Sequence, residues 1–185
     1  MGRSTRGRGL VLGVSLLALA GFGCTPEPVT PTPPPTSAAS ATPTETAQER
    51  EERLAYEAAE KSYREFSAEY RHVTGAGGAA EPTERMKDTA AGPYLADAAK
   101  VIEAFKETGG YTKGSARFGY IRPAGYSTKS LLLDVCEDET GVQTYNAKRK
   151  QIATNGILLL QLEVRSIKGQ WKVWDYTGKE AKTCA

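Results

Sequence analysis

Few side chains in this sequence of 185 residues could form a metal site or a nucleophilic active site. The chain has three cysteines and one histidine, whereas metal sites are usually built from clusters of such ligands. We therefore predict no metal, and no motif points to a cofactor. We interpret His72 as a residue beside a helix C-terminus, where a cation is favoured, rather than as a general base. The acidic run CEDET at 136–140 lacks the ligand spacing of a calcium loop, which favours a solvated turn.

The first cysteine, Cys24, follows a segment typical of an export signal. Residues 1–8 contain three arginines and no acid, and residues 10–20 read LVLGVSLLALA. A basic start followed by a short apolar run is typical of a secretory signal peptide, and the run is too short for a comfortable membrane span.

The sequence GFGC at 21–24 resembles the lipobox of bacterial lipoproteins. There the cysteine sulfur receives a diacylglycerol and becomes the first mature residue. Gly23 fits this pattern, whereas Gly21 stands where the family usually has Leu. The resemblance implies a signal peptide over 1–23 and acyl chains such as palmitate on Cys24. They would hold the protein on the extracytoplasmic face of the cell membrane, since each buried methylene contributes roughly 0.8 kcal/mol. The alternative is an ordinary signal peptide with a cysteine nearby by chance.

Residues 24–46 consist largely of Pro, Thr, Ser and Ala. This composition cannot bury a core and predicts a disordered linker. In extended proline-rich geometry the linker would span roughly 60 Å, and its threonines would also permit O-glycosylation.

The overall charge gives no support for nucleic-acid binding. Lys and Arg number 24 and Asp and Glu number 22. Without the three arginines of the signal segment, 21 basic residues remain against 22 acidic ones. A nucleic-acid-binding domain would instead carry a basic stripe or patch.

Helices are predicted first in the remaining domain, residues 47–185. TAQE at 46–49 forms a capping box, and an apolar stripe runs from Tyr56 to Val73 at helical spacing, ending near Gly75. A short helix is expected after Pro82, and another from Pro93 to Gly109.

Strands are predicted after the helices. Alternating apolar residues or turn signals mark them, in the segments GSARFGYIRP, STKSLLLDVCED, GVQTYNAK, GILLLQLEVRSI and QWKVWDYTGKE. A KG turn joins the last two as a hairpin. This order predicts an α+β fold with helices on one face of a curved antiparallel sheet.

This pattern, with YLADAAKVIEAFKETGGYTKG, LLLDVCEDETGVQTYNAK, QWKVW and a cysteine near the end, resembles secreted actinobacterial lipoproteins of the nuclear transport factor 2-like type. The resemblance implies a cone-shaped α+β domain with a pocket between sheet and helices. Within such a pocket, Tyr120 and Asp134 are the candidate acid–base residues. No motif extends the activity of ketosteroid isomerase-like members of this fold to the chain.

With Cys24 assigned to lipid, Cys136 and Cys184 remain. In an exported protein an even pair predicts one disulfide. The alternative, a catalytic or metal-binding thiol, has no supporting cluster.

The last strand carries aromatic residues on both faces. Trp171 and Val173 would share one face, and Trp174 and Tyr176 the other. The second pair either packs under a helix or a neighbouring strand, or forms an interface with a partner, where aromatic residues are enriched.

These observations predict a membrane-anchored, non-enzymatic lipoprotein that binds a protein partner or a small apolar ligand at the cell surface. The alternative is a small isomerase or dehydratase that uses the conical pocket. A third hypothesis is a phage-derived lipoprotein that blocks later infection.

Overall fold

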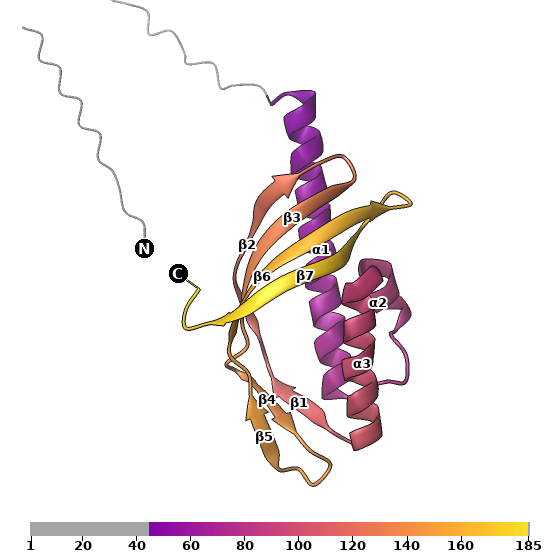
Figure 1. Ribbon diagram of the computed structural model, residues 1–185, viewed down its shortest axis with the longest axis vertical. Helices are drawn as coiled ribbons and strands as arrows, with labels where there is room; N and C mark the ends of the chain where they lie inside the picture. Colours follow the sequence, from indigo (N-terminus) through magenta and orange to yellow (C-terminus); the bar gives the residue numbers. More distant parts are fainter. Residues whose placement is uncertain (1–44, 185) are drawn as a thin grey trace, which may run out of the picture. The chain divides into compact units, whose positions relative to one another are not determined.

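The computed structural model describes residues 45–184, in which three helices precede seven strands (Figure 1). The helices are α1 (Ala47–Gly75), α2 (Glu84–Thr89) and α3 (Gly92–Thr108). The strands are β1 (Tyr111–Gly114), β2 (Arg117–Tyr126), β3 (Ser130–Asp138), β4 (Val142–Tyr145), β5 (Gln151–Thr154), β6 (Ile157–Ile167) and β7 (Gln170–Ala181). The α+β class predicted from the sequence is confirmed. Cys24 and the predicted signal peptide and linker lie outside the described residues, except for the linker's last two.

Helix α1 begins at the predicted capping box. The Thr46 hydroxyl accepts a hydrogen bond from the Glu49 backbone N–H at 3.2 Å, and the Glu49 carboxylate accepts one from the Thr46 N–H at 2.7 Å. Because both N–H groups lie before the first helical hydrogen bonds, the box removes two unpaired donors from this end. The predicted apolar stripe is the buried face of the helix, as Tyr63, Phe66 and Val73 show.

The strands form two antiparallel sheets, where a single curved sheet was expected. The larger sheet has the order β2-β3-β6-β7, and the smaller has the order β1-β4-β5. The two strands that the sequence did not predict, β1 and β5, have four residues each. They escaped prediction because such short strands carry little alternation of apolar and polar residues.

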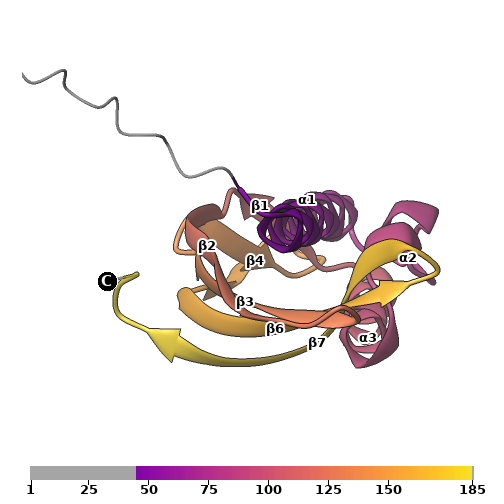
Figure 2. The ribbon, with the colours of Figure 1, turned by 90° about the horizontal axis from the view of Figure 1, so that it is seen from above.

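Helix α1 lies across one face of the larger sheet, and α2 and α3 lie beside β7 (Figure 2). The inward side chains of β3 and β6, such as Leu133, Val135 and Leu162, are at most 1% exposed. They pack in one cluster with Tyr63 and Phe66 of α1. The core therefore joins the strands and the helix that border the cavity described below.

The outer face of the larger sheet carries the predicted disulfide between Cys136 and Cys184. Their Cα atoms are 5.6 Å apart, and the bond links β3 to the end of the chain. Gly119 of β2 lies directly beneath it, and a Cβ at this position would collide with the Cys184 sulfur. The disulfide prediction is confirmed, and glycine is needed at position 119 to leave room for the bond.

No helix within residues 45–184 is long and apolar enough to cross a membrane.

Candidate ligand-binding cavity

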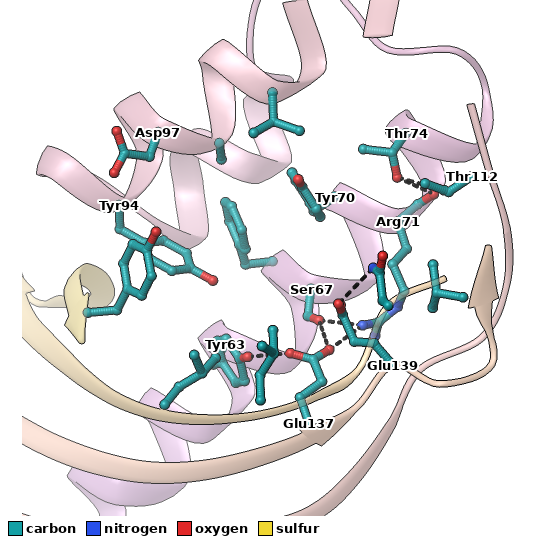
Figure 3. A pocket seen from close by; sticks show the side chains of 18 of the residues that line it. Tyr63, Ser67, Tyr70, Arg71, Thr74, Tyr94, Asp97, Thr112, Glu137 and Glu139 are labelled. Atoms are coloured by element: carbon teal, nitrogen blue, oxygen red, sulfur yellow. Dashed lines mark hydrogen bonds and ion pairs between the residues drawn. The ribbon is translucent and has the colours of Figure 1, made fainter. Parts of the chain in front are cut away.

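A cavity of about 400 Å³ lies among α1, α3 and the inner faces of both sheets. Its polar lining is shown in Figure 3, in which side chains from the helices face two glutamates from the strand side. The volume is within the usual range for small-molecule sites, roughly 300–1,000 Å³. Aromatic and aliphatic side chains supply most of the remaining wall.

Glu137 of β3 forms the base of the cavity and is 5% exposed. One carboxylate oxygen accepts hydrogen bonds from Arg71 at 2.6 Å and from the Ser67 hydroxyl at 3.1 Å. The other accepts the Tyr63 hydroxyl at 2.7 Å (Figure 3). A buried carboxylate is tolerated when it is paired and hydrogen-bonded in this way. Glu137 is therefore held in one orientation, with its charge balanced by Arg71.

Glu139 lies in the turn after β3 and is only partly buried. The Asn155 side-chain amide donates a hydrogen bond to it at 2.9 Å. Burial raises the pKa of the Glu139 carboxyl, and the neighbouring Glu137 raises it further, against the lowering effects of Asn155 and Arg71. Glu139 is thus the carboxyl group of the cavity whose ionised form is disfavoured in the empty domain.

Aromatic rings form the wall opposite the glutamates. The Phe66 ring lies 6.1 Å from Tyr70 in a stacked arrangement and 4.9 Å from Tyr94 in a tilted one. The Tyr94 ring meets Tyr176 edge-on at 5.4 Å. The four rings thus present differently oriented surfaces to the cavity from α1, α3 and β7.

The hydroxyl groups of Tyr70, Tyr94 and Tyr176 have no hydrogen-bond partner among residues 45–184. Burial raises the pKa of Tyr70 to about 12 and that of Tyr94 higher still. Both phenols therefore remain protonated at neutral pH and can donate or accept a hydrogen bond to a bound molecule.

Tyr120 and Asp134, predicted to lie in the pocket, are on the opposite face of the sheet. They are β-sheet neighbours of Cys136 and Arg122, and the Arg122 guanidinium lies 4.5 Å from the Tyr120 ring centre. Gln161 donates a hydrogen bond to Asp134 at 3.1 Å. Neither residue lines the cavity. For Asp134 the prediction overlooked the alternation along β3, which places it opposite the inward leucines.

Tyr120 is displaced by a β-bulge in β2. The register shifts between Phe118 and Tyr120, so that Phe118 pairs with Glu137 and Tyr120 pairs with Cys136. The residue between them, Gly119, is the extra one, and it reverses the alternation that the sequence pattern suggested.

A second bulge separates Trp174 from Tyr176, which were predicted to share a face. Val173 and Tyr176 pair with the inward residues Val164 and Leu162, which leaves Trp174 as the extra residue. Tyr176 therefore points into the cavity and is 41% exposed at its edge.

Trp174 packs at the start of α3. A Cβ on Gly92 would lie 2.7 Å from its ring, and the Arg165 guanidinium lies 4.5 Å from the ring centre. The start of a helix thus covers part of the indole. This agrees with the expectation that Trp174 packs under a helix or a neighbouring strand. The partner interface remains a prediction.

The two glutamates of the cavity belong to the run CEDET, which was interpreted as a solvated turn. Only the end of this run forms such a turn, in which Asp138 accepts hydrogen bonds from the Thr140 N–H and hydroxyl. The signal that could have found Glu137 and Glu139 is the period-two pattern of β3. Extending it from Leu133 and Val135 places both glutamates on the inner face.

A second hollow, of about 510 Å³, lies between α1 and β2. Its lining is dominated by charged side chains such as Glu49, Arg53 and Glu57, which are exposed. Leu133 is its one fully buried lining residue. Its polar groups are on exposed side chains, whereas the first cavity has a buried carboxylate at its base, so we take the first cavity as the candidate site.

Comparison with known protein families finds no family model that matches the chain, and comparison with curated proteins finds no matching relative. Within residues 45–184, no group of three or more His, Cys, Asp or Glu side chains is placed to hold a metal ion.

Proposed function

We propose that this protein is a lipid-anchored, extracytoplasmic binding protein whose domain holds a small, largely apolar ligand in the cavity. The observation that carries the proposal is an aromatic-walled cavity of about 400 Å³ with polar groups fixed at its base. Such a combination favours a ligand with an apolar body and a few polar atoms. The domain is of the nuclear transport factor 2-like type, which the order of helices and antiparallel strands supports.

Binding is favoured over catalysis because the best-buried acid is already fully engaged. Glu137 accepts hydrogen bonds from three side chains, and Arg71 compensates its charge. A general base needs an accepting oxygen free to reach a substrate proton. Glu137 instead acts as a structural anchor for α1 and β3.

The binding proposal is tested by native mass spectrometry of the full-length protein extracted from membranes in mild detergent. The expected result is a retained small-molecule mass that disappears in Val101→Trp, because Val101 lines the cavity and is 40% exposed. Leu54→Trp is the matched control, since Leu54 is 51% exposed on α1 and lines neither hollow. Equal retention by the wild type and Val101→Trp would contradict the proposal.

The anchor rests on the lipobox-like sequence at Cys24. Cys24→Ala is expected to move the protein from the membrane fraction to the soluble fraction, because the thioether-linked acyl chains would be lost. The measurement is fractionation followed by immunoblotting, with Cys136→Ala as the control that removes a different cysteine. An unchanged membrane fraction for Cys24→Ala would refute the anchor.

An isomerase or dehydratase is the second candidate, and Glu139 is the observation that favours it. A carboxyl group with a raised pKa beside protonated tyrosines is a typical acid–base arrangement. The recovered ligand is incubated with fresh protein in D₂O. Deuterium at a carbon atom, or loss of water, would support the enzyme, whereas an unchanged ligand mass would support binding alone.

A further inference from the structure

The charged residues that line the cavity leave one carboxylate without a cationic partner. Arg71 pairs with Glu137 at 2.6 Å, and Asp97 pairs with Lys100 at 2.8 Å. Glu139 has no ion pair with any residue from 45 to 184, and its one side-chain hydrogen-bond partner is the neutral amide of Asn155. Arg71 attracts it electrostatically but is already paired with Glu137. When Glu139 is ionised, the cavity therefore carries an uncompensated negative charge.

The aromatic wall also lacks a cation. Elsewhere in the described domain, positive side chains lie over the rings of Phe118, Tyr120 and Trp174 at 4.5–5.7 Å. No such contact involves the cavity rings of Phe66, Tyr70, Tyr94 or Tyr176 within residues 45–184. Ring faces attract cations electrostatically, more strongly when water is excluded.

We propose that the cavity binds a small organic amine in its protonated form, with the ammonium beside Glu139 and the apolar body against the four rings of the aromatic wall. This inference rests on the proposed function, because it names the chemical class of ligand for the same cavity. An ammonium group would donate to the carboxylate oxygen that Asn155 leaves unpaired. Neighbouring phenol hydroxyls, which are acceptors as well as donors, can take its remaining hydrogens.

The ligand class explains why an unpaired glutamate faces a largely apolar cavity. Burying a carboxylate without a cation costs stability, and a bound cation would offset that cost. A purely apolar ligand would leave Glu139 desolvated and unpaired. An anionic ligand would add repulsion from the unpaired Glu139.

The test compares three probes with the same phenyl body and different charge. They are 2-phenylethylamine, 2-phenylethanol and 3-phenylpropanoate, titrated against the full-length protein in lipid nanodiscs by ligand-observed NMR, with empty nanodiscs as the blank. The amine is expected to bind about tenfold more tightly than the alcohol, and the carboxylate more weakly than both.

Three variants test the contacts: two separate the ion pair with Glu139 from the effect of a surface carboxylate, and the third removes a ring. Glu139→Gln keeps an oxygen for Asn155 and is expected to remove most of the amine's advantage while the alcohol is unaffected. Glu107→Gln is the control, because Glu107 is exposed on α3 and does not line the cavity. Tyr176→Leu keeps apolar volume but removes a ring, and should weaken the amine more than the alcohol.

The outcomes distinguish this inference from the proposed function. If the alcohol binds as tightly as the amine, and Val101→Trp abolishes both, the cavity is a binding site but the amine proposal is overturned. If Glu139→Gln and Glu107→Gln change amine binding equally, the proposal is also overturned. If no probe distinguishes the wild type from Val101→Trp, the proposed function fails as well.

Discussion

At the scale of single residues, the ion pair of Arg71 and Glu137 is more buried than the pair of Lys100 and Asp97, which also borders the cavity. Its glutamate side chain is 6% exposed, whereas the surface pair of Arg165 and Glu163 has a glutamate that is 30% exposed. Both pairs have an N–O distance of 2.6 Å. They differ in burial and in the two hydroxyl groups that also donate to Glu137, so the comparison measures the buried network against a more exposed ion pair.

Glu137→Ala is expected to lower the free energy of unfolding by about 3–5 kcal/mol, because Arg71 and two hydroxyl groups would lose their common partner. Glu163→Ala is expected to cost about 0–1 kcal/mol, as exposed pairs do. Urea denaturation followed by circular dichroism measures both. Equal effects of the two substitutions would show that burial does not govern the Arg71–Glu137 pair.

Glu139→Gln is expected to stabilise the empty domain at neutral pH. The folded-state pKa of Glu139 is raised, so the folded protein binds more protons than the unfolded chain between the ordinary pKa and the raised one. Stability from this group therefore falls as the pH increases through that window. Glutamine carries no charge and escapes the loss, while it retains an acceptor for Asn155.

Melting temperatures at pH 7 and pH 4 measure this effect. The variant should be more stable than the wild type at pH 7, and the difference should shrink at pH 4, where Glu139 is protonated. Arg71 and Glu137, which face Glu139 from α1 and β3, are unchanged in both proteins. A variant that is less stable at pH 7 would mean that the charge of Glu139 is satisfied in the empty domain.

At the scale of elements, the helices could be predicted because their ends carry local signals. The capping box at Thr46, Pro93 in the first turn of α3 and the left-handed Gly109 at its end all act within a few residues. The turn at Lys168 and Gly169 is equally local, since both residues have positive φ.

The bulges at Gly119 and Trp174 could not be predicted in this way. Each bulge lies where a segment distant in sequence packs on the strand: the disulfide with Cys184 at Gly119, and the start of α3 at Trp174. Since each bulge reverses the alternation of faces, Tyr120 was assigned to the cavity, and Trp174 and Tyr176 were assigned to the same face. These two wrong face assignments therefore have the same physical cause, a β-bulge in the strand.

The contact between β7 and α3 leads to a prediction about Gly92. This residue has φ of 60°, and a Cβ there would meet the Trp174 ring. Gly92→Ala is therefore expected to destabilise the domain by about 1–3 kcal/mol through backbone strain and the displaced indole. Trp174 fluorescence during thermal unfolding reports both effects.

Gly156→Ala is the control for this substitution, because a Cβ at Gly156 would meet nothing within 4 Å and its φ is not positive. It should change the melting temperature little. If Gly92→Ala behaves in the same way, α3 is not positioned by its contact with Trp174.

At the scale of the whole domain, the cavity arises where α1 and α3 face the inner sides of both sheets. The sequence predicted helices against an antiparallel sheet and a pocket between them, and the first of these is confirmed. It missed the smaller sheet, which supplies Val142 and Thr144 to the cavity. The smaller sheet is built from segments distant in sequence. Its short polar strands, such as β5, carry no alternation of apolar and polar residues that would predict them.

The same distance in sequence explains the missed site residues. Tyr63 and Glu137 are 74 positions apart, and Asn155 meets Glu139 from beyond β5. Tyr63 and Glu137 lie on elements that the sequence predicted, whereas Glu139 and Asn155 lie just outside the predicted strands. Their convergence depends on how α1 is set against β3. The apolar stripe of α1 was predicted from its helical spacing, and its residues form both core and cavity wall.

Photo-crosslinking in living cells tests the central claim, that the cavity holds a small molecule, most directly. The photoreactive residue p-azidophenylalanine replaces Tyr176 at the edge of the cavity, or Ile152, which is 60% exposed and does not line it. After irradiation, mass spectrometry of the peptide containing position 176 should reveal a small-molecule adduct, and the peptide containing position 152 should carry none. A protein-sized adduct at position 176, or the same adducts at both positions, would contradict the account.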